Sequence, residues 1–297
     1  MDRHTRTFDR HRARLYGIAY RMLGSHADAE DMLQDTYLRW HRVEPERVRV
    51  PEAWLTTTVT RLCIDRLRAA KTEREAYPGP WLPEPIDGAL AAPADHDAEL
   101  ASDLSVAFLV VLERLAPAER AAFLLHDVFE SDYAEIAGIL GKSEASCRQI
   151  VHRARERVRR DRPRFAVSEA ARQRLLGRFV DAMRNADKDA FLELFAEDAT
   201  WTSDGGGKVA AASKAVTGNA RIAKLLHGVA RALIRAHGED IDFRLAPING
   251  ETGIVIDIGG HPFGAITLDV DGRRVLAGYN VLNPEKLGAI FSSAPRT

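Results

Sequence analysis

The sequence predicts a multidomain protein: two all-α domains, the second with a helix-turn-helix, followed by an α+β domain. Three observations predict this fold class. Apolar residues recur at helical spacing up to residue 71 and again over residues 104–162. A stretch rich in proline and acidic residues, 72–103, separates these two parts and is typical of a linker. After residue 169, helical segments give way to β-branched, alternating ones.

The composition fits two or three folded domains in 297 residues, since 45% are hydrophobic and 29% are charged. No apolar run reaches about 18 residues, so we expect no membrane contact. The charged N-terminal segment lacks the apolar region of a secretory signal. Cys63 and Cys147 stand far apart without CxxC spacing. We therefore expect a reduced, cytoplasmic protein with no disulfide framework, metal or cofactor.

The first domain, residues 1–71, is expected to hold three helices. Apolar residues from 15 to 23 repeat at helical spacing, and Gly24-Ser25 then interrupts the pattern. A second helix is predicted from about Asp28 to His41. Pro51 suits the first turn of a third helix, PEAWLTTTVTRLCIDRLRAA.

The second domain, residues 104–164, carries the pattern of a helix-turn-helix. Pro117 is expected to start one helix and Asp132 to cap the next. Gly141 supplies a tight turn, and Ser143 can accept backbone N–H groups to begin the last helix. Two helices joined by a short glycine-containing turn, the second rich in arginine, are typical of DNA-binding proteins.

The last helix of this domain concentrates positive charge on a chain whose net charge is −1. Residues 142–164 contain nine Lys/Arg and three Asp/Glu. With Cys147, Ile150 and Val151 facing inward, arginine and glutamine side chains are left to pair with guanine and adenine in the major groove. The predicted DNA-facing residues are Arg148, Gln149, His152, Arg153 and Arg155. Arg157, Arg159 and Arg160 are expected to hold phosphates, and a solvated basic helix is the alternative interpretation.

The segment DAEDMLQDTYLRW resembles the helix by which extracytoplasmic-function (ECF) sigma factors grip the β′ clamp helices of RNA polymerase. The matching residues Asp31, Gln34 and Asp35 share one helix face at i, i+3 and i+4. WLTTTVTRLCIDRLR resembles the family segment that captures the −10 element, although many members carry Asn in place of Arg61. The residues expected to bind −10 DNA are Arg61, Asp65, Arg66, Arg68 and Lys71.

The resemblance to ECF sigma factors covers residues 4–71 and 104–160, in the family's order. It places the −35 readers on Arg148, Gln149, His152 and Arg153. It implies a non-enzymatic protein that directs RNA polymerase to promoters. The implied partners are the polymerase core, through its β′ clamp helices and β flap, and promoter DNA.

The C-terminal domain, residues 169–297, is predicted to place helices before an antiparallel sheet. The helices are expected over residues 171–187 and 188–198. Strands are expected in IDFRLAPI, TGIVIDIG, FGAITLDV and RRVLAGYNVL. Asn249-Gly250 and Asp271-Gly272 are typical hairpin turns between them.

The start of this domain resembles SnoaL-like domains, which have the NTF2-like α+β fold. Three motifs, WLPEP, DGGGK and NPEKL, resemble the sigma-J-type subgroup, in which such a fused domain is thought to regulate the sigma factor in cis. The residues expected at this interdomain regulatory contact are Trp81, Leu82, Pro83, Asp204, Gly205, Gly206, Gly207, Lys208, Asn283, Pro284, Glu285, Lys286 and Leu287. Consecutive glycines allow close backbone approach, so we expect the three motifs to lie together. A plain glycine turn beside an exposed linker is the alternative.

Two other functions are compatible with parts of this sequence. One is a helix-turn-helix regulator that senses a small molecule and needs no polymerase. The other is a SnoaL-like enzyme fused to a DNA-binding domain, with Asp198, Asp204, His227 and His261 as the ionisable candidates. DGGGK does not have the spacing of a phosphate-binding loop. We predict no catalytic residue, and the sequence identifies no small-molecule ligand for the C-terminal domain.

Overall fold

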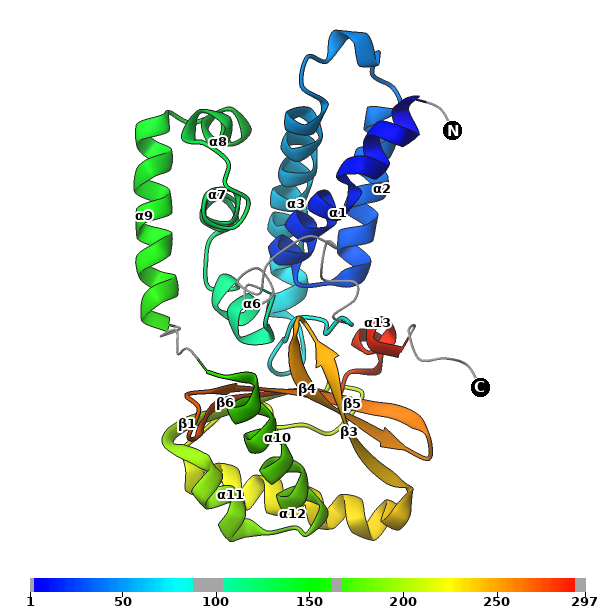
Figure 1. Cartoon of the computed structure of the whole chain (residues 1–297), viewed down its shortest axis with the longest axis vertical. Helices are drawn as coiled ribbons and strands as arrows, with labels where there is room; N and C mark the ends of the chain where they lie inside the picture. Colours follow the sequence, from blue (N-terminus) through cyan, green and yellow to red (C-terminus); the bar gives the residue numbers. More distant parts are fainter. Residues whose placement is uncertain (1–2, 88–103, 162–166, 292–297) are drawn as a thin grey trace. The chain divides into compact units, whose positions relative to one another are not determined.

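The computed structural model describes residues 3–87, 104–161 and 167–291, which form two compact units (Figure 1). The described part of unit 1 comprises residues 3–76, 104 and 108–161, and that of unit 2 comprises 77–87, 105–107 and 167–291. Over these residues, no helix is both long and apolar enough to cross a membrane.

Unit 1 is all-α. Its α-helices are α1 (Arg3–Leu23), α2 (His26–Trp40), α3 (Pro51–Glu75), α6 (Val106–Leu112, from Phe108 onward), α7 (Pro117–Asp127), α8 (Tyr133–Leu140) and α9 (Glu144–Asp161), with a 3-10 helix at Pro45–Arg47. Helices α1, α2 and α3 pack on one another around a buried core that includes Leu15, Trp40 and Leu55. Helix α3 continues past the expected residue 70 to Glu75. The linker expected from residue 72 therefore begins with a helical turn, because no helix-breaking residue precedes Pro78.

The helix-turn-helix is formed by α8 and α9, and its predicted caps are confirmed. Asp132 Oδ1 accepts the Glu135 N–H at 2.7 Å. Gly141 adopts φ 64°, the left-handed conformation that ends a helix. Ser143 Oγ accepts the Ser146 N–H at 3.2 Å and so supports the start of α9.

Unit 2 is α+β. Its α-helices are α10 (Glu169–Arg184), α11 (Lys188–Leu194), α12 (Asn219–His237) and α13 (Gly288–Phe291), with 3-10 helices η2 (Gly238–Asp240) and η3 (Pro284–Lys286). Its strands are β1 (Phe195–Asp204), β2 (Val216–Thr217), β3 (Ile241–Ile248), β4 (Glu251–Ile258), β5 (His261–Val270) and β6 (Val275–Val281). Helices α10, α11 and α12 cover one face of the sheet (Figure 1).

The sheet has six strands in the order β2-β1-β6-β5-β4-β3. The predicted strands β3 to β6 pair antiparallel, and Asn249-Gly250 turns between β3 and β4 with φ of 53° and 76°. However, β1 pairs parallel with β6, so the prediction of a purely antiparallel sheet is wrong. The pairing joins segments separated by most of the domain, which no local sequence pattern reveals.

Two elements of unit 2 differ from the sequence prediction. The second helix ends at Leu194 instead of residue 198, because Phe195 already belongs to β1 and pairs with Val275. The sequence prediction, in which helices precede all strands, does not include α12, which lies between β2 and β3 in the chain. Helix α12 packs against α11 and β1, so helices and strands alternate in the chain more than expected.

Candidate functional site

The acidic face of α2 is exposed, as docking on another protein would require. Asp31, Gln34 and Asp35 point to solvent, whereas Leu33 and Trp40 on the opposite side are buried. We call these three exposed residues the clamp face. Leu38 lies one turn further along and is 47% exposed, although it is apolar. Helical periodicity does not predict an exposed leucine at this position. Its side chain places an apolar surface beside the acidic groups.

Helix α3 distributes its predicted DNA-binding residues over two sides. Arg61, Asp65 and Arg68 are exposed and share one face at i, i+4 and i+7. Lys71 is exposed as well, with Glu75 3.8 Å away. Arg66 instead lies between two carboxylates, 3.1 Å from Asp28 Oδ1 and 3.1 Å from Glu73 Oε2.

Arg61 is occupied by a contact within unit 1. Its Nε donates to the Ile139 carbonyl at 3.0 Å and its Nη2 donates to the Gly138 carbonyl at 2.8 Å. Both acceptors lie in the last turn of α8, where carbonyl groups lack intrahelical partners and the helix dipole favours a cation. Arg61 therefore links α3 to the helix-turn-helix.

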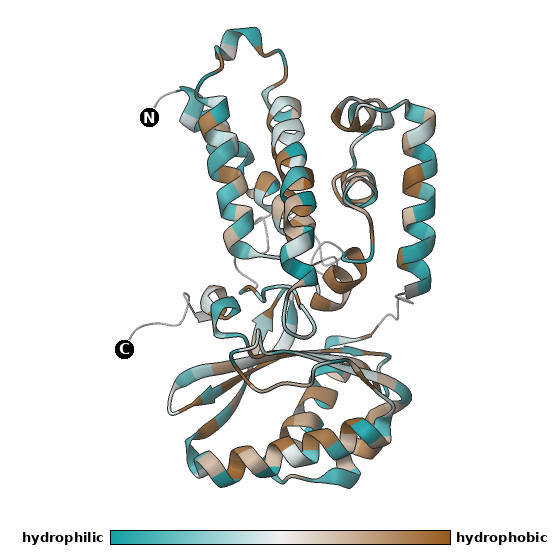
Figure 2. Cartoon of the chain, turned by 180° about the vertical axis from the view of Figure 1, so that it is seen from behind, coloured by the Kyte–Doolittle hydropathy of each residue, from teal (hydrophilic) through white to brown (hydrophobic). Residues whose placement is uncertain are grey.

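Four of the predicted −35 residues lie together on the exposed side of α9. Arg148, Gln149, His152 and Arg153 are all exposed, and we call them the reader face. The opposite side buries the apolar residues Cys147, Ile150, Val151, Ala154 and Val158. Figure 2 shows the resulting alternation of hydrophilic and hydrophobic bands along α9. The arrangement suits the major groove, because base edges are read by side chains of one exposed helix face.

Arg155 does not join the reader face. Its Nε donates to Asp127 Oδ2 at 2.7 Å, its Nη2 donates to Asp127 Oδ1, and Nη2 lies 3.2 Å from His126 Nδ1. The hydrogen bonds to Asp127 raise the pKa of Arg155 above its usual value. This bidentate ion pair fastens α9 to the end of α7. The exposed residues Arg157, Arg159 and Arg160 continue the basic surface beyond it.

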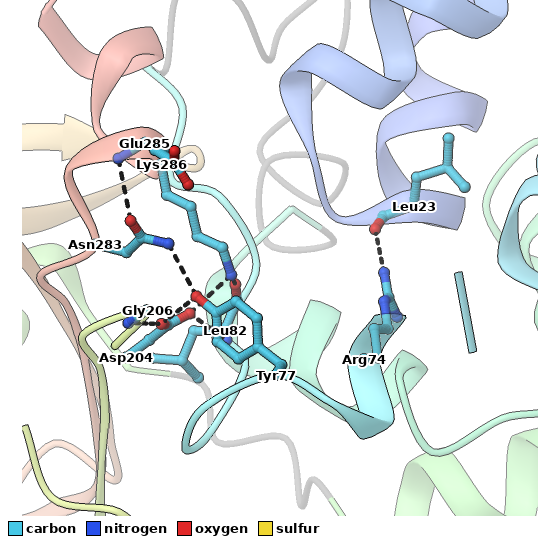
Figure 3. A network of polar contacts seen from close by, with 9 residues as sticks. All are labelled: Leu23, Arg74, Tyr77, Leu82, Asp204, Gly206, Asn283, Glu285 and Lys286. Carbon is cyan, nitrogen blue, oxygen red and sulfur yellow. Dashed lines mark hydrogen bonds and ion pairs between the residues drawn. The ribbon is translucent and has the colours of Figure 1, made fainter. Parts of the chain in front are cut away.

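In unit 2, the three motifs meet at the carboxylate of Asp204, which is 0% exposed (Figure 3). Oδ1 accepts the Tyr77 hydroxyl at 2.7 Å and the Gly206 N–H at 3.0 Å. Oδ2 accepts the Leu82 N–H at 2.8 Å and Lys286 Nζ at 2.7 Å. We call this cluster the Asp204 network. It joins the linker, the DGGGK loop and the NPEKL segment through one buried charge.

Lys286 and Asn283 complete the Asp204 network from the C-terminal side. Lys286 Nζ donates to the Leu82 carbonyl at 2.6 Å and lies 4.1 Å from the centre of the Trp81 ring. Asn283 Nδ2 donates to the Tyr77 hydroxyl at 2.9 Å. Burial, followed by the hydrogen bond to Asp204, raises the pKa of Tyr77. A cation over an aromatic face is a stabilising arrangement that uses the Trp81 ring without burying it fully.

The glycines of DGGGK permit the close approach of neighbouring segments. Gly206 and Gly207 have φ of 59° and 71°, a region that other residues adopt at a cost. A methyl group on Gly207 would lie 2.7 Å from Pro78 Cγ, and one on Gly206 would overlap the Asn283 amide. Lys208 forms an ion pair with Glu285, although both side chains are largely exposed.

The linker has a second attachment, at the turn between β3 and β4. The Ile86 N–H donates to Asn249 Oδ1 at 3.0 Å, and the Asn249 N–H donates to the Ile86 carbonyl at 2.9 Å. Residues 82–86 are buried. The sequence predicts Asn249 as a turn residue. It does not predict that Asn249 binds the linker or that Tyr77 binds Asp204, because both contacts join distant parts of the chain.

Comparison with known protein families shows that residues 7–73 match the Sigma-70 region 2 family and residues 105–158 match the Sigma-70 region 4 family. The chain is 38% identical over 300 residues to the ECF RNA polymerase sigma factor SigJ of Mycobacterium tuberculosis, covering 97% of this chain and 93% of that protein. The crystal structure of that organism's SigJ matches with a TM-score of 0.74 and 36% identity, covering 96% of this chain and 98% of that one. The probable ECF sigma factor SigI of the same species is 35% identical over 186 residues, covering 62% of this chain and 64% of that protein.

The chain belongs to the ECF RNA polymerase sigma factors. It is a sigma factor for promoter recognition, with the polymerase core and promoter DNA as its partners. This membership confirms the predicted family, its fold class and its general function. It also decides against a helix-turn-helix regulator that works without polymerase.

The ionisable residues considered for catalysis in this sigma factor do not converge. Asp198 and His261 are exposed on different strands, and His227 Nδ1 lies 2.7 Å from the Ala186 carbonyl. Asp204 is saturated by the Asp204 network. Between the helices and the sheet, Phe179, Phe191, Phe195 and Trp201 form a buried aromatic cluster. Among the described residues, no group of three or more His, Cys, Asp or Glu is placed to hold a metal ion.

Proposed function

We propose that this sigma factor binds core polymerase through the clamp face of α2, −10 DNA through α3 and −35 DNA through the reader face of α9. The observation that carries the proposal is the reader face: four polar side chains lie exposed on one side of a capped helix-turn-helix. Arg68 and Lys71 supply the exposed charge of α3, and Arg61 adds to it when it leaves α8. The proposal places the protein in the cytoplasm with the polymerase.

The decisive experiment is run-off transcription with core polymerase and this protein as the sole specificity factor. We expect a discrete transcript whose start depends on the −35 sequence. Random initiation, or no association with core at low salt, where charge interactions are strongest, would contradict the proposal.

The clamp face is tested by reversing its charge. Asp35→Arg is expected to weaken binding to core polymerase at least tenfold, because a cation would meet the surface that the acid is proposed to contact. Asp9→Arg is the matched control, since Asp9 is an exposed acid on α1 outside the clamp face. Equal binding of the two variants would exclude the clamp face as the docking surface.

The β′ clamp helices and the β flap are the proposed contacts of the first and second domains, respectively.

We further propose that unit 2 regulates the sigma factor in cis and performs no catalysis. Three motifs from the linker and the C-terminal domain converge on one buried carboxylate, which ties the linker between the two DNA-binding parts to the domain that follows them. Through these contacts the C-terminal domain can change the conformation of the linker, and thereby the activity of the two DNA-binding domains that the linker connects. The placement of Asp198, His227 and His261 on different strands and helices, without a shared site, favours a regulatory domain over an enzyme.

Regulation in cis is tested on the full chain with Asp204→Asn, which removes the charge that Lys286 pairs with. We expect the transcript level to change at least twofold, whereas Asp198→Asn, an exposed acid on the same strand, leaves it unchanged. A transcript level that is the same in both variants and in the parent protein would contradict a regulatory role.

A further inference from the structure

Arg148 is the member of the reader face with contacts on two sides. Its guanidinium carbon lies 5.0 Å from the centre of the Tyr133 ring, and its Nη2 donates to Glu144 Oε2 at 2.9 Å. Tyr133 begins α8 and Glu144 begins α9. The guanidinium is thus held by the first residues of both helices of the helix-turn-helix.

The Tyr133 ring is in turn held by a contact with α7. It packs on the His126 ring of α7 with the ring centres 4.4 Å apart. His126 Nδ1 lies 3.0 Å from Asp127 Oδ1, and Asp127 holds Arg155 of α9. A continuous stack therefore runs from the end of α7 through Tyr133 to Arg148.

Two physical consequences follow for base recognition. A flexible arginine loses rotamer freedom when it pairs with a base, and an arginine already held loses less. The carboxylate of Glu144 also repels phosphates, so it favours a base edge over the DNA backbone as the partner of Arg148. Five guanidinium N–H donors are available, so one bond to Glu144 leaves enough for bidentate pairing with guanine.

We propose that Tyr133 and Glu144 are positioning residues that pre-set Arg148 to select guanine at one base pair of the −35 element. The inference rests on the proposed role of α9 as the −35 reader and adds which side chain discriminates and what holds it. Arg153, on the same face, is exposed and serves as the comparison.

The test uses the full chain bound to core polymerase and promoters changed one base pair at a time across the −35 element. Arg148→Ala identifies the base pair whose discrimination depends on Arg148. Tyr133→Leu is expected to reduce discrimination at that base pair about two- to fivefold, the range typical of an exposed cation–ring contact. The double variant should lose no more than Arg148→Ala alone, because both changes remove one function.

Control variants separate positioning from general damage. Tyr133→Phe keeps the ring and should keep the discrimination. In Tyr133→Leu, the base pair that Arg153→Ala identifies should be read as in the parent protein. Undiminished discrimination at the Arg148 base pair, or an equal loss at every base pair, would overturn the inference.

Glu144→Gln tests the second contact. It should lower discrimination at the Arg148 base pair and increase the salt dependence of DNA binding by up to about one phosphate contact, because Arg148 becomes free to bind the backbone. Glu130→Gln, an exposed acid that precedes α8, should change neither. If Glu144→Gln behaves like Glu130→Gln, Glu144 is not a positioning residue. If Arg148→Ala alters no base discrimination, both the −35 role of Arg148 and the inference are wrong. If Arg148→Ala does alter discrimination but Tyr133→Leu does not, only the inference is wrong.

Discussion

Asp204 shows at the scale of one residue what holds the described linker residues 77–87 to the C-terminal domain. A buried carboxylate is stable only when its oxygens are fully paired, and here four donors face it. Three of these donors come from the linker and the NPEKL segment. The Asp204 carboxylate therefore needs the linker for half of its hydrogen bonds, and the linker needs the carboxylate for its attachment.

Asp204→Asn is expected to release the linker. The amide cannot accept all four hydrogen bonds and leaves Lys286 without its counter-charge, a change that costs about 3 kcal/mol when a buried ion pair loses one member. Hydrogen–deuterium exchange should accelerate at Leu82 and its neighbours, with less change at Ile86, which is held by Asn249. Unchanged exchange at Leu82 would show that the carboxylate does not hold the linker. Asp198→Asn controls for loss of an acid on the same strand.

Tyr77 makes the same contact sensitive to alkaline pH. Burial and the hydrogen bond to Asp204 raise its pKa, so the docked linker favours the neutral phenol. A raised pKa in the docked state means that the Tyr77 contribution is complete below the ordinary tyrosine pKa of about 10 and is lost as the pH rises further. Trp81 fluorescence should follow this loss as the pH rises above about 10. In Tyr77→Phe the corresponding change should be absent. An identical pH profile in both proteins would contradict the assignment.

At the scale of secondary-structure elements, the helix-turn-helix depends on the seating of α9 against α7. Arg155 binds both carboxylate oxygens of Asp127, which a lysine cannot do. Arg155→Lys should therefore lower the free energy of unfolding by about 1 kcal/mol, as measured by thermal or urea denaturation. Arg153→Lys, which changes an exposed arginine of the same helix, should leave stability unchanged. If promoter binding falls while stability does not, Arg155 acts on DNA and not on helix packing.

The elements that could be predicted from sequence are those whose determinants are local. Asp132, Gly141 and Ser143 lie within a turn of the helix ends that they cap, so the helix-turn-helix was predicted with its boundaries. Asn249-Gly250 fixed a hairpin in the same way. Phe195 continues the apolar spacing of α11, so the sequence predicts that it is helical. Its strand conformation depends on pairing with Val275, eighty residues later in the numbering.

The candidate sites follow the same division. Exposure of the clamp face and the reader face follows from helical periodicity, because residues at i, i+3 and i+4 share a side. The partners of Tyr77, Arg61 and Arg155 depend on tertiary packing. Sequence periodicity places a charged side chain on a face, but it does not indicate whether that side chain is free or already paired.

At the scale of the whole molecule, unit 1 holds its two groups of helices together through arginines that donate to backbone carbonyls. Arg14 Nη2 donates to the Phe129 carbonyl at 2.8 Å, and Arg120 Nη1 donates to the Met22 carbonyl at 2.6 Å. Arg61 adds its two bonds to the last turn of α8. These contacts join α1 and α3 to α7 and α8 in the closed arrangement of unit 1.

We expect −10 DNA to compete with α8 for Arg61, because its Nε and Nη2 already donate to α8 carbonyls. Arg61→Ala should therefore increase the distance between α3 and α9 in the free protein, whereas Lys71→Ala, which removes an exposed α3 cation, should not. The distance can be measured by fluorescence transfer between labels on Thr72→Cys and Arg153→Cys, which leave the proposed −10 contacts in place. Native Cys63 and Cys147 are buried, and burial raises the pKa of both thiols, so the introduced cysteines react first. Single-stranded −10 DNA should produce the same opening in the protein that retains Arg61. An unchanged distance in Arg61→Ala would show that the other arginine–carbonyl bonds are sufficient for closure.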